Sequence, residues 1–238
     1  TLEDLETTAR RSLRMPIPLG GFHLGVSRLS VVDPGAAWVP APAAAGAAGP
    51  VPCDLVICCA FTARHTVLRE IILESLTAVP EIDLYWVLTG STEEDLAFIR
   101  EIAAETGRVG GFVCANRPLG RKWQSCVRQA YLGFDAALTA ITGSDDILPG
   151  VFLQRLAARH RAALAQGLAP AFQPALHCTN DWLVVDIDPA SAFGGGIYRC
   201  SYRPGQTFQP VGAGRFYSRH AMTLVEGHLF DSRAARLL

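Results

Sequence analysis

The sequence predicts an α/β protein whose central sheet is mostly parallel and carries helices on both faces. Between residues 54 and 167, short apolar runs alternate with amphipathic helical patterns, and the joining segments are only a few residues long. Because parallel neighbours must be joined by a crossover, this rhythm indicates parallel strands with right-handed helical connections. After Gly167, strand patterns follow one another without helices, which indicates a smaller antiparallel extension.

Four apolar runs are expected to form the parallel strands. Each is short, rich in aliphatic residues and bounded by turn residues, as is typical of strands buried on both faces. They are residues 54–60, 83–88, 111–115 and 136–142.

The helices between these strands have identifiable ends. Ser91 and Glu94 have the spacing of a capping box, and Gly107 follows as a helix stop. Pro149 has the position of a first-turn proline. The expected helices are residues 65–76, 91–106, 121–132 and 149–166.

The rest of the chain is expected to form an N-terminal arm and a second half of the same domain. Residues 1–50 are interpreted as an arm that ends in an Ala-, Pro- and Gly-rich linker. Residues 51–238 form one domain, divided into the halves 51–167 and 168–238. In the second half we expect strands at residues 171–176, 181–187 and 196–202 and a helix at residues 215–225.

The composition limits the partners and the compartment. The chain has 238 residues, of which 50% are hydrophobic and 18% charged, and its formal net charge is -1. A charge so close to zero does not predict a nucleic-acid partner. No apolar run reaches the roughly 20 residues of a transmembrane helix. The seven cysteines form no C-x-x-C pair, so we expect buried free thiols and a cytoplasmic location.

Two adjacent carboxylates, Asp145 and Asp146, follow the strand at residues 136–142 after a Gly143-Ser144 break. Ligands in open α/β sheets bind at the carboxyl ends of the strands, where this pair is expected to lie. Two such groups repel each other unless a cation or hydrogen bonds neutralise them. A hard divalent ion that bridges to a diphosphate is therefore a natural partner. The alternative is a surface turn in which Ser144 or Asp145 caps the next helix.

Cationic residues are expected at the same edge of the sheet. Arg117, Arg121 and Lys122 come at the start of a helix, where backbone N–H groups also favour anions. Together with the acidic pair they would suit a diphosphate. The alternative is an ordinary solvated first helical turn.

Four stretches agree in order and spacing with one known family. They are Cys59-Ala60-Phe61-Thr62-Ala63-Arg64, Asn116-Arg117-Pro118-Leu119-Gly120-Arg121-Lys122-Trp123-Gln124, Thr142-Gly143-Ser144-Asp145-Asp146, and residues 212–219 continuing through 225–231. Together they resemble the nucleotide-sugar-binding domain of GT-A glycosyltransferases, most like the family 2 type. The resemblance spans residues 54–231 and implies a Rossmann-like GT-A fold with a smaller acceptor-side extension.

The resemblance also implies roles for individual residues. The donor would be a nucleoside-diphosphate sugar of the UDP type, with Mn²⁺ or Mg²⁺ held by Asp145 and Asp146, and the acceptor is unknown. Lys122 and Arg121 would neutralise the leaving diphosphate. The implied nucleotide-binding residues are Ala60, Phe61, Thr62, Arg64, Asn116, Gly120, Arg121, Lys122 and Ser144.

Some positions depart from the family's pattern. Gly143 or Ser144 replaces the first Asp of the metal motif, and Gly90-Ser91 stands where an Asp usually holds the base or ribose. The expected Glu-Asp catalytic pair has no counterpart, so Asp181 or Glu226 is the candidate base, or the base lies in a tail or is absent. Trp182 is a candidate sugar-stacking face or a core residue.

Two other classes of function remain open. A sugar nucleotidyltransferase shares the fold but usually has a long Gly-rich loop after the first strand, where this chain has only residues 61–64. A non-catalytic nucleotide-binding module of the same fold is compatible with the missing catalytic pair.

Overall fold

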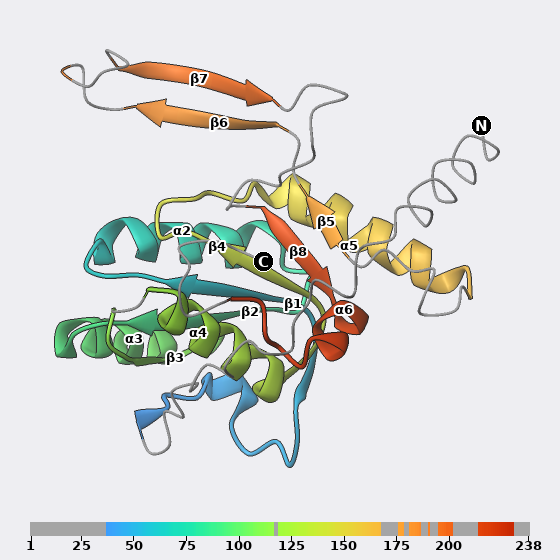
Figure 1. Ribbon diagram of the computed structural model, residues 1–238, viewed down its shortest axis with the longest axis horizontal. Coiled ribbons are helices and arrows are strands. Elements are labelled where there is room, and N and C mark those ends of the chain that lie inside the picture. Colours follow the sequence, from blue (N-terminus) through green and yellow to red (C-terminus); the bar gives the residue numbers. More distant parts are fainter. Residues whose placement is uncertain are drawn as a thin grey trace, which may run out of the picture. The chain divides into compact units, whose positions relative to one another are not determined.

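The computed structural model describes residues 37–116, 119–167, 176–178, 181–186, 190, 195–201 and 214–230. Within these ranges the chain forms a six-stranded sheet in the order β3-β2-β1-β4-β8-β5, and a separate two-stranded sheet of β6 and β7 (Figure 1). The strands of the larger sheet are β1 (Val51–Ala60), β2 (Leu84–Gly90), β3 (Val109–Val113), β4 (Phe134–Thr142), β5 (Leu176–Cys178) and β8 (Arg215–Ser218). The helices are η3 (Pro42–Ala44), α2 (His65–Ala78), α3 (Glu93–Thr106), α4 (Leu119–Gly133), α5 (Gly150–Ala165) and α6 (Arg219–Leu224).

The predicted parallel arrangement of the first four strands is confirmed. β1 lies in the middle and pairs in parallel with β2 on one side and β4 on the other, with Leu55 opposite both Leu84 and Leu138. β3 pairs in parallel with β2. The carboxyl ends of β2, β1 and β4 therefore lie next to one another at one edge of the sheet.

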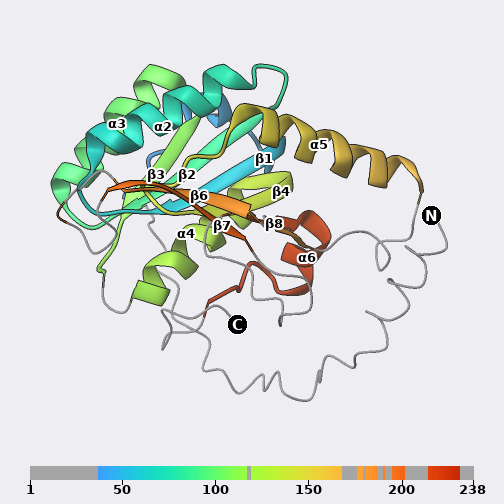
Figure 2. The ribbon, with the colours of Figure 1, turned by 90° about the horizontal axis from the view of Figure 1, so that it is seen from above.

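Helices cover both faces of this sheet, as predicted (Figure 2). Alternate residues of β1 point to opposite faces, so Ile57 packs in a core with α2, α3 and α5, whereas Cys58 packs in a core with α4 and α6. Both residues are fully buried, which is the reason that β1 shows a continuous apolar run rather than an alternating one.

The antiparallel extension is confirmed for the described strands. β8 pairs antiparallel with β4, and β5 pairs antiparallel with β8. β6 (Asp181–Asp186) and β7 (Gly196–Ser201) pair antiparallel with each other. Of the strand expected at residues 171–176, only residue 176 lies within the described part of the chain.

Two local predictions were wrong. The helix expected at residues 215–225 is the strand β8 followed by the short α6, because the edge of β4 gives residues 215–218 a pairing partner. The capping box of α3 is formed by Thr92 and Asp95 rather than Ser91 and Glu94. Both candidate pairs have the same spacing, and tertiary contacts of the Asp95 side chain select one of them.

Residues 38–41 pack against β3. Val39 forms an antiparallel bridge with Gly111, exchanging two backbone hydrogen bonds of 2.8 Å. Trp38 lies 6.1 Å from the ring of Phe112, and Ala41 is buried. This contact satisfies backbone groups of β3 that an edge strand would otherwise expose.

The five cysteines whose side chains the structure describes are free thiols. Cys58, Cys59, Cys114 and Cys126 are buried and Cys53 is partly buried. No helix within the described ranges is long and apolar enough to cross a membrane.

We expect Gly111→Ala to destabilise the protein. An added Cβ at Gly111 would lie 2.4 Å from the Leu88 carbonyl oxygen, which belongs to a paired strand and cannot move aside. Overpacking of this kind costs about 1–3 kcal/mol of unfolding free energy. Gly133→Ala is the matched control, because its Cβ would meet nothing within 4 Å. Thermal or urea unfolding measures both, and equal stability of the two variants would contradict this packing.

Candidate functional site

Three loops meet at the carboxyl edge of the sheet. Residues 61–64 follow β1, residues 91–92 follow β2, and residues 143–149 follow β4. The first turn of α4 reaches the same edge, because Lys122 contacts the first two loops. This edge is where an open α/β sheet presents a ligand site.

The loop after β1 has an unusual backbone. Ala63 and Arg64 both adopt left-handed conformations, with φ of 55° and 60°. This geometry costs a residue with a Cβ roughly 1–2 kcal/mol, so contacts with the surrounding structure must stabilise the loop. One such contact is the Ala63 N–H, which donates to Asp95 Oδ1 at 3.0 Å.

Asp95 is a buried anchor for this loop. It accepts the backbone N–H groups of Ser91 at 2.7 Å and Thr92 at 3.2 Å, and it contacts His65 Nε2 at 2.7 Å. Burial alone raises the pKa of the Asp95 carboxyl. The hydrogen bonds from Ser91, His65, Ala63 and Thr92 outweigh burial and leave that pKa below its usual value. Asp95 therefore stays ionised while it joins α3 to the loop after β1.

Lys122 joins the same loops from α4. Its side chain is buried, and its Nζ donates to the Phe61 carbonyl, to Thr62 Oγ1 at 3.2 Å and to Ser91 Oγ at 2.6 Å. An ammonium group has three N–H bonds, and these three oxygens take all of them. Burial lowers the pKa of Lys122, while the charge of the Asp95 carboxylate acts in the opposite direction.

Lys122 is thus held by three protein oxygens, and its expected contact with a diphosphate stays a prediction. To donate to a phosphate oxygen, Lys122 would first have to release one of these protein oxygens, because all three of its N–H bonds are used. The sequence showed a cation in the first helical turn, but it did not show that the turn faces a backbone carbonyl. Asp95, His65 and Ser91 were also missed, because nothing local distinguishes Asp95 from Glu93 and Glu94 beside it.

The acidic pair lies in the turn after β4. Asp146 Oδ2 accepts the Gly143 N–H at 2.6 Å, and Asp146 is partly buried. Burial raises the pKa of the Asp146 carboxyl and the charge of Asp145 raises it further, while the Gly143 hydrogen bond opposes them. A Cβ at Gly143 would lie 2.7 Å from the same oxygen, so a larger residue there would have to displace the Asp146 carboxylate.

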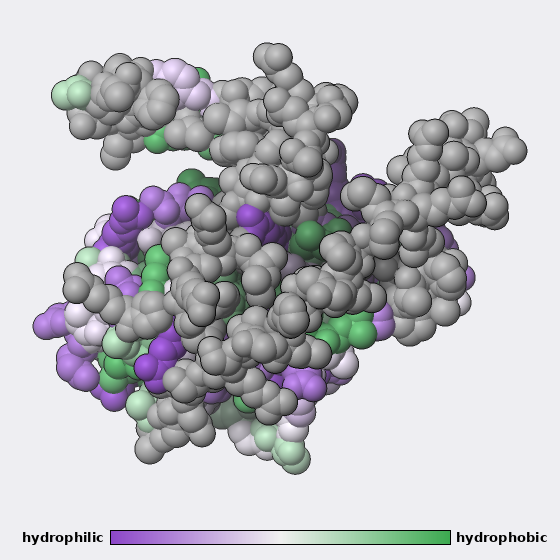
Figure 3. Space-filling view, in the orientation of Figure 1, coloured by the Kyte–Doolittle hydropathy of each residue, from purple (hydrophilic) through white to green (hydrophobic). Residues whose placement is uncertain are grey.

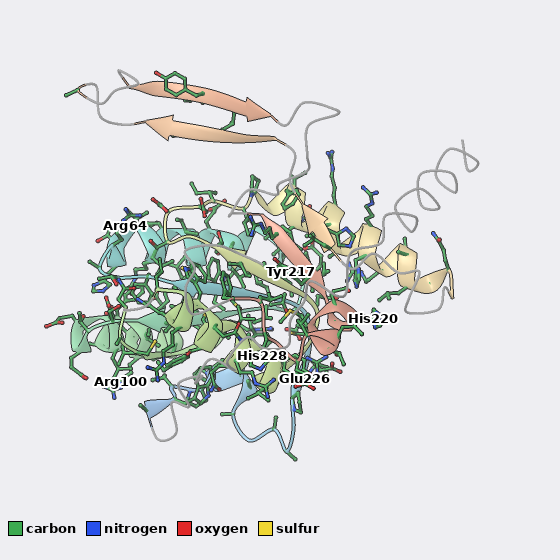
Figure 4. All side chains as sticks on the ribbon, in the orientation of Figure 1. Arg64, Arg100, Tyr217, His220, Glu226 and His228 are labelled. Atoms are coloured by element: carbon green, nitrogen blue, oxygen red, sulfur yellow. The ribbon has the colours of Figure 1, made fainter. Side chains whose placement is uncertain are left out.

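Neither carboxylate of the pair caps the following helix. The N-cap residue of α5 is Pro149, and no side chain caps it. Asp145 instead points to the loop after β1, where Arg64 Nη1 donates to Asp145 Oδ2 at 2.5 Å. The two side chains stay 55% and 60% exposed, so solvent ions and ligands can reach both. Hydrophilic residues gather on the surface around Arg64 (Figures 3 and 4).

The other predicted nucleotide-binding residues lie in the same strand ends and turns. Thr62 and Asn116 are exposed, Ala60 and Arg121 are partly buried, and Phe61, Gly120 and Ser144 are buried. Arg117 lies outside the described residues. The structure therefore brings these residues to one edge of the sheet, but it leaves only some of them accessible.

Neither candidate base is brought to this edge by a described contact. Glu226 lies in the turn after α6, where its backbone carbonyl accepts a hydrogen bond from Arg128 of α4. Figure 4 shows Glu226 beside α6 and apart from Arg64. Asp181 and Trp182 belong to β6, and their side chains lie outside the described part of the structure.

A shallow hollow of about 450 Å³ lies at the opposite, amino edge of the sheet. Its carboxylates are already paired, Asp54 with Arg161, Asp83 with Arg108 and Asp135 with Arg219. Three arginines from separate segments neutralise the three acidic groups there, whereas Arg64 pairs with only one of the two carboxylates of the Asp145–Asp146 turn.

The acidic pair fits one kind of metal site only. The described residues contain no group of three or more His, Cys, Asp or Glu side chains that could enclose a metal ion. Two adjacent carboxylates suit Mg²⁺ or Mn²⁺ when most of the other ligands are water and phosphate oxygens. The donor set is therefore consistent with an ion that arrives with a diphosphate.

Comparison with known proteins gives only distant likenesses. No protein-family model and no curated protein matches the chain. Among solved structures, S. aureus TarS 1-349 is similar over 74% of this chain and 50% of its own, at 13% identity and a TM-score of 0.46. The apo-form glycosyltransferase GlyE of Streptococcus pneumoniae TIGR4 is similar over 73% of this chain and 35% of its own, at 17% identity and a TM-score of 0.33. This chain thus spans half or less of either structure, and a fold shared this loosely does not define a donor, a metal or an acceptor.

Replacing Lys122 distinguishes a structural role from a phosphate-binding one. We expect Lys122→Met to lower the unfolding free energy by about 2–4 kcal/mol, because the Phe61 carbonyl is left buried without its donor. Lys122→Arg keeps the charge but not the compact ammonium group, and its unfolding free energy should fall by less than that of Lys122→Met. Urea unfolding without ligand is the measurement. Unchanged stability of Lys122→Met would contradict the structural role.

Proposed function

We propose that this chain is a metal-dependent glycosyltransferase that binds a UDP-type sugar donor at the carboxyl edge of β2, β1 and β4. The observation that carries the proposal is the meeting of Arg64 with the Asp145–Asp146 turn. An exposed cation beside two carboxylates, next to backbone N–H groups at the start of a helix, offers partners to both a diphosphate and its metal ion.

Asp145 would be the main ligand of Mn²⁺ or Mg²⁺. It is exposed, whereas Asp146 is partly buried and already accepts the Gly143 N–H. Asp146 would orient the turn and add negative charge, or provide a second oxygen. When bound, the divalent ion supplies Lewis-acid stabilisation of the negative charge on the departing diphosphate.

Other residues of the edge would position the donor. Arg64 and Arg121 would neutralise phosphate oxygens, and Thr62 and Asn116 present exposed polar groups from the ends of β1 and β3. Phe61, whose ring is buried, would form the floor beneath the base rather than a stacking surface. Lys122 and Asp95 keep the loops in place and would act on the donor only through them.

A non-catalytic nucleotide-binding module is the second candidate. It is favoured by the position of Glu226, which lies beside α6 and apart from Arg64, with no described contact that brings it to the carboxyl edge (Figure 4). Asp181 remains the candidate base. Slow release of UDP from a UDP-sugar with Mn²⁺ would indicate a transferase, and binding without release would indicate the module.

Asp145→Asn tests the metal site. Asn keeps the size of the side chain but removes the charge that a hard cation requires. We expect the Mn²⁺-dependent part of the UDP affinity to be lost, while the melting temperature without ligand stays within about 2 °C of the parent, because exposed ion pairs contribute little. Calorimetric titration with UDP, with and without Mn²⁺, is the measurement.

The matched control is Asp135→Asn, which removes a carboxylate that is 57% exposed at the amino end of the same strand and pairs with Arg219. It should leave the Mn²⁺ effect on UDP binding unchanged. If Asp145→Asn also keeps the full Mn²⁺ effect, the acidic pair is not the metal site.

A further inference from the structure

We propose that Arg64 couples the binding of the metal ion to the binding of the nucleotide. Arg64 neutralises Asp145 in the nucleotide-free protein, and it exchanges that carboxylate for diphosphate oxygens when the two ligands bind together. This inference rests on the proposed function, since it assigns Asp145 to the metal and the diphosphate to the same edge.

Arg64 has contacts at its backbone and at its guanidinium group. Its backbone lies at the N-cap of α2, where its carbonyl accepts the Leu68 N–H at 3.0 Å, and its guanidinium donates to Asp145 at 2.5 Å. Ala63 before it is tied to Asp95. The root of the side chain is therefore fixed, and its tip can change partner without any movement of the loop.

The charges make the Arg64 contact and metal binding competitive. An arginine within 2.5 Å of Asp145 stabilises the carboxylate as a counter-ion, but a divalent cation on the same carboxylate would repel it. Metal binding to the free protein must therefore overcome this repulsion or displace Arg64 from Asp145 Oδ2, and either cost is subtracted from the metal affinity. Asp146 further favours a bound cation, because its carboxylate adds a second negative charge to the same turn.

The diphosphate removes this competition. Its oxygens offer Arg64 a second set of acceptors, and guanidinium groups bind such oxygens in a bidentate manner. Once Arg64 has moved to the diphosphate, its repulsion of a metal ion on Asp145 is lost. Mn²⁺ and UDP should then strengthen each other's binding, and by linkage the factor is the same in both directions.

Arg64→Gln removes the counter-ion and tests the coupling. Free Mn²⁺ is followed by electron paramagnetic resonance during titration of the intact chain, once without UDP and once with saturating UDP. We expect Arg64→Gln to bind Mn²⁺ alone about two- to fivefold more tightly than the parent, the range of an exposed ion pair. The factor by which UDP raises the Mn²⁺ affinity should fall by at least as much.

Arg69→Gln is the matched control on the same helix. Arg69 pairs with Glu101 at 2.7 Å and with Glu105, both on α3, so its loss removes one positive charge without touching Asp145. It should leave both titrations unchanged. Arg64→Lys keeps the charge and should restore most of the competition.

Three other results would overturn the inference or what it rests on. Weaker or unchanged binding of Mn²⁺ alone by Arg64→Gln overturns the counter-ion role, even where the parent binds Mn²⁺ and UDP together. Equal effects of Arg64→Gln and Arg69→Gln attribute the change to net charge and also overturn it. Failure of the parent to bind Mn²⁺ even with UDP rejects the metal-dependent function itself, and the coupling with it.

Discussion

The buried ammonium of Lys122 is the interaction on which the candidate site depends. It connects α4 to the loops after β1 and β2 through the Phe61 carbonyl, Thr62 and Ser91. Removing a charge from water is costly, so such a group persists only when all its hydrogens are paired. Here the pairing is complete, and one side chain fixes α4 and the loops after β1 and β2 relative to one another.

The hydrogen bonds of Asp95 form a second network next to Lys122. Asp95 accepts N–H groups from Ser91, Thr92 and Ala63, and thereby stabilises the left-handed residues of the loop after β1. With Lys122 and Asp95 committed to the framework, only the exposed groups remain for a ligand. Arg64 and Asp145 are the exposed pair that this framework presents, which is why the proposed chemistry is assigned to them rather than to the more buried charges.

The sequence predicted the framework better than the roles of its charged residues. The run of buried residues in β1 and the short connections were enough for the parallel sheet, because backbone pairing and two-sided burial leave a strong pattern. Residues 215–218 were misassigned, since their strand exists only because β4 offers an edge. The contact of Lys122 with a carbonyl 61 residues away in sequence was not predicted. Contacts of that range are set by the packing of α4, which local patterns do not contain.

The most direct test of the central claim is amide hydrogen exchange of the intact chain with and without UDP and Mn²⁺. If the carboxyl edge is the site, exchange should slow in peptides covering residues 60–65, 90–96 and 142–149, and most when both ligands are present. Protection confined to the amino edge around Cys53, Asp83 and Asp135, or absent from all three loops while UDP is bound, would contradict the placement of the site.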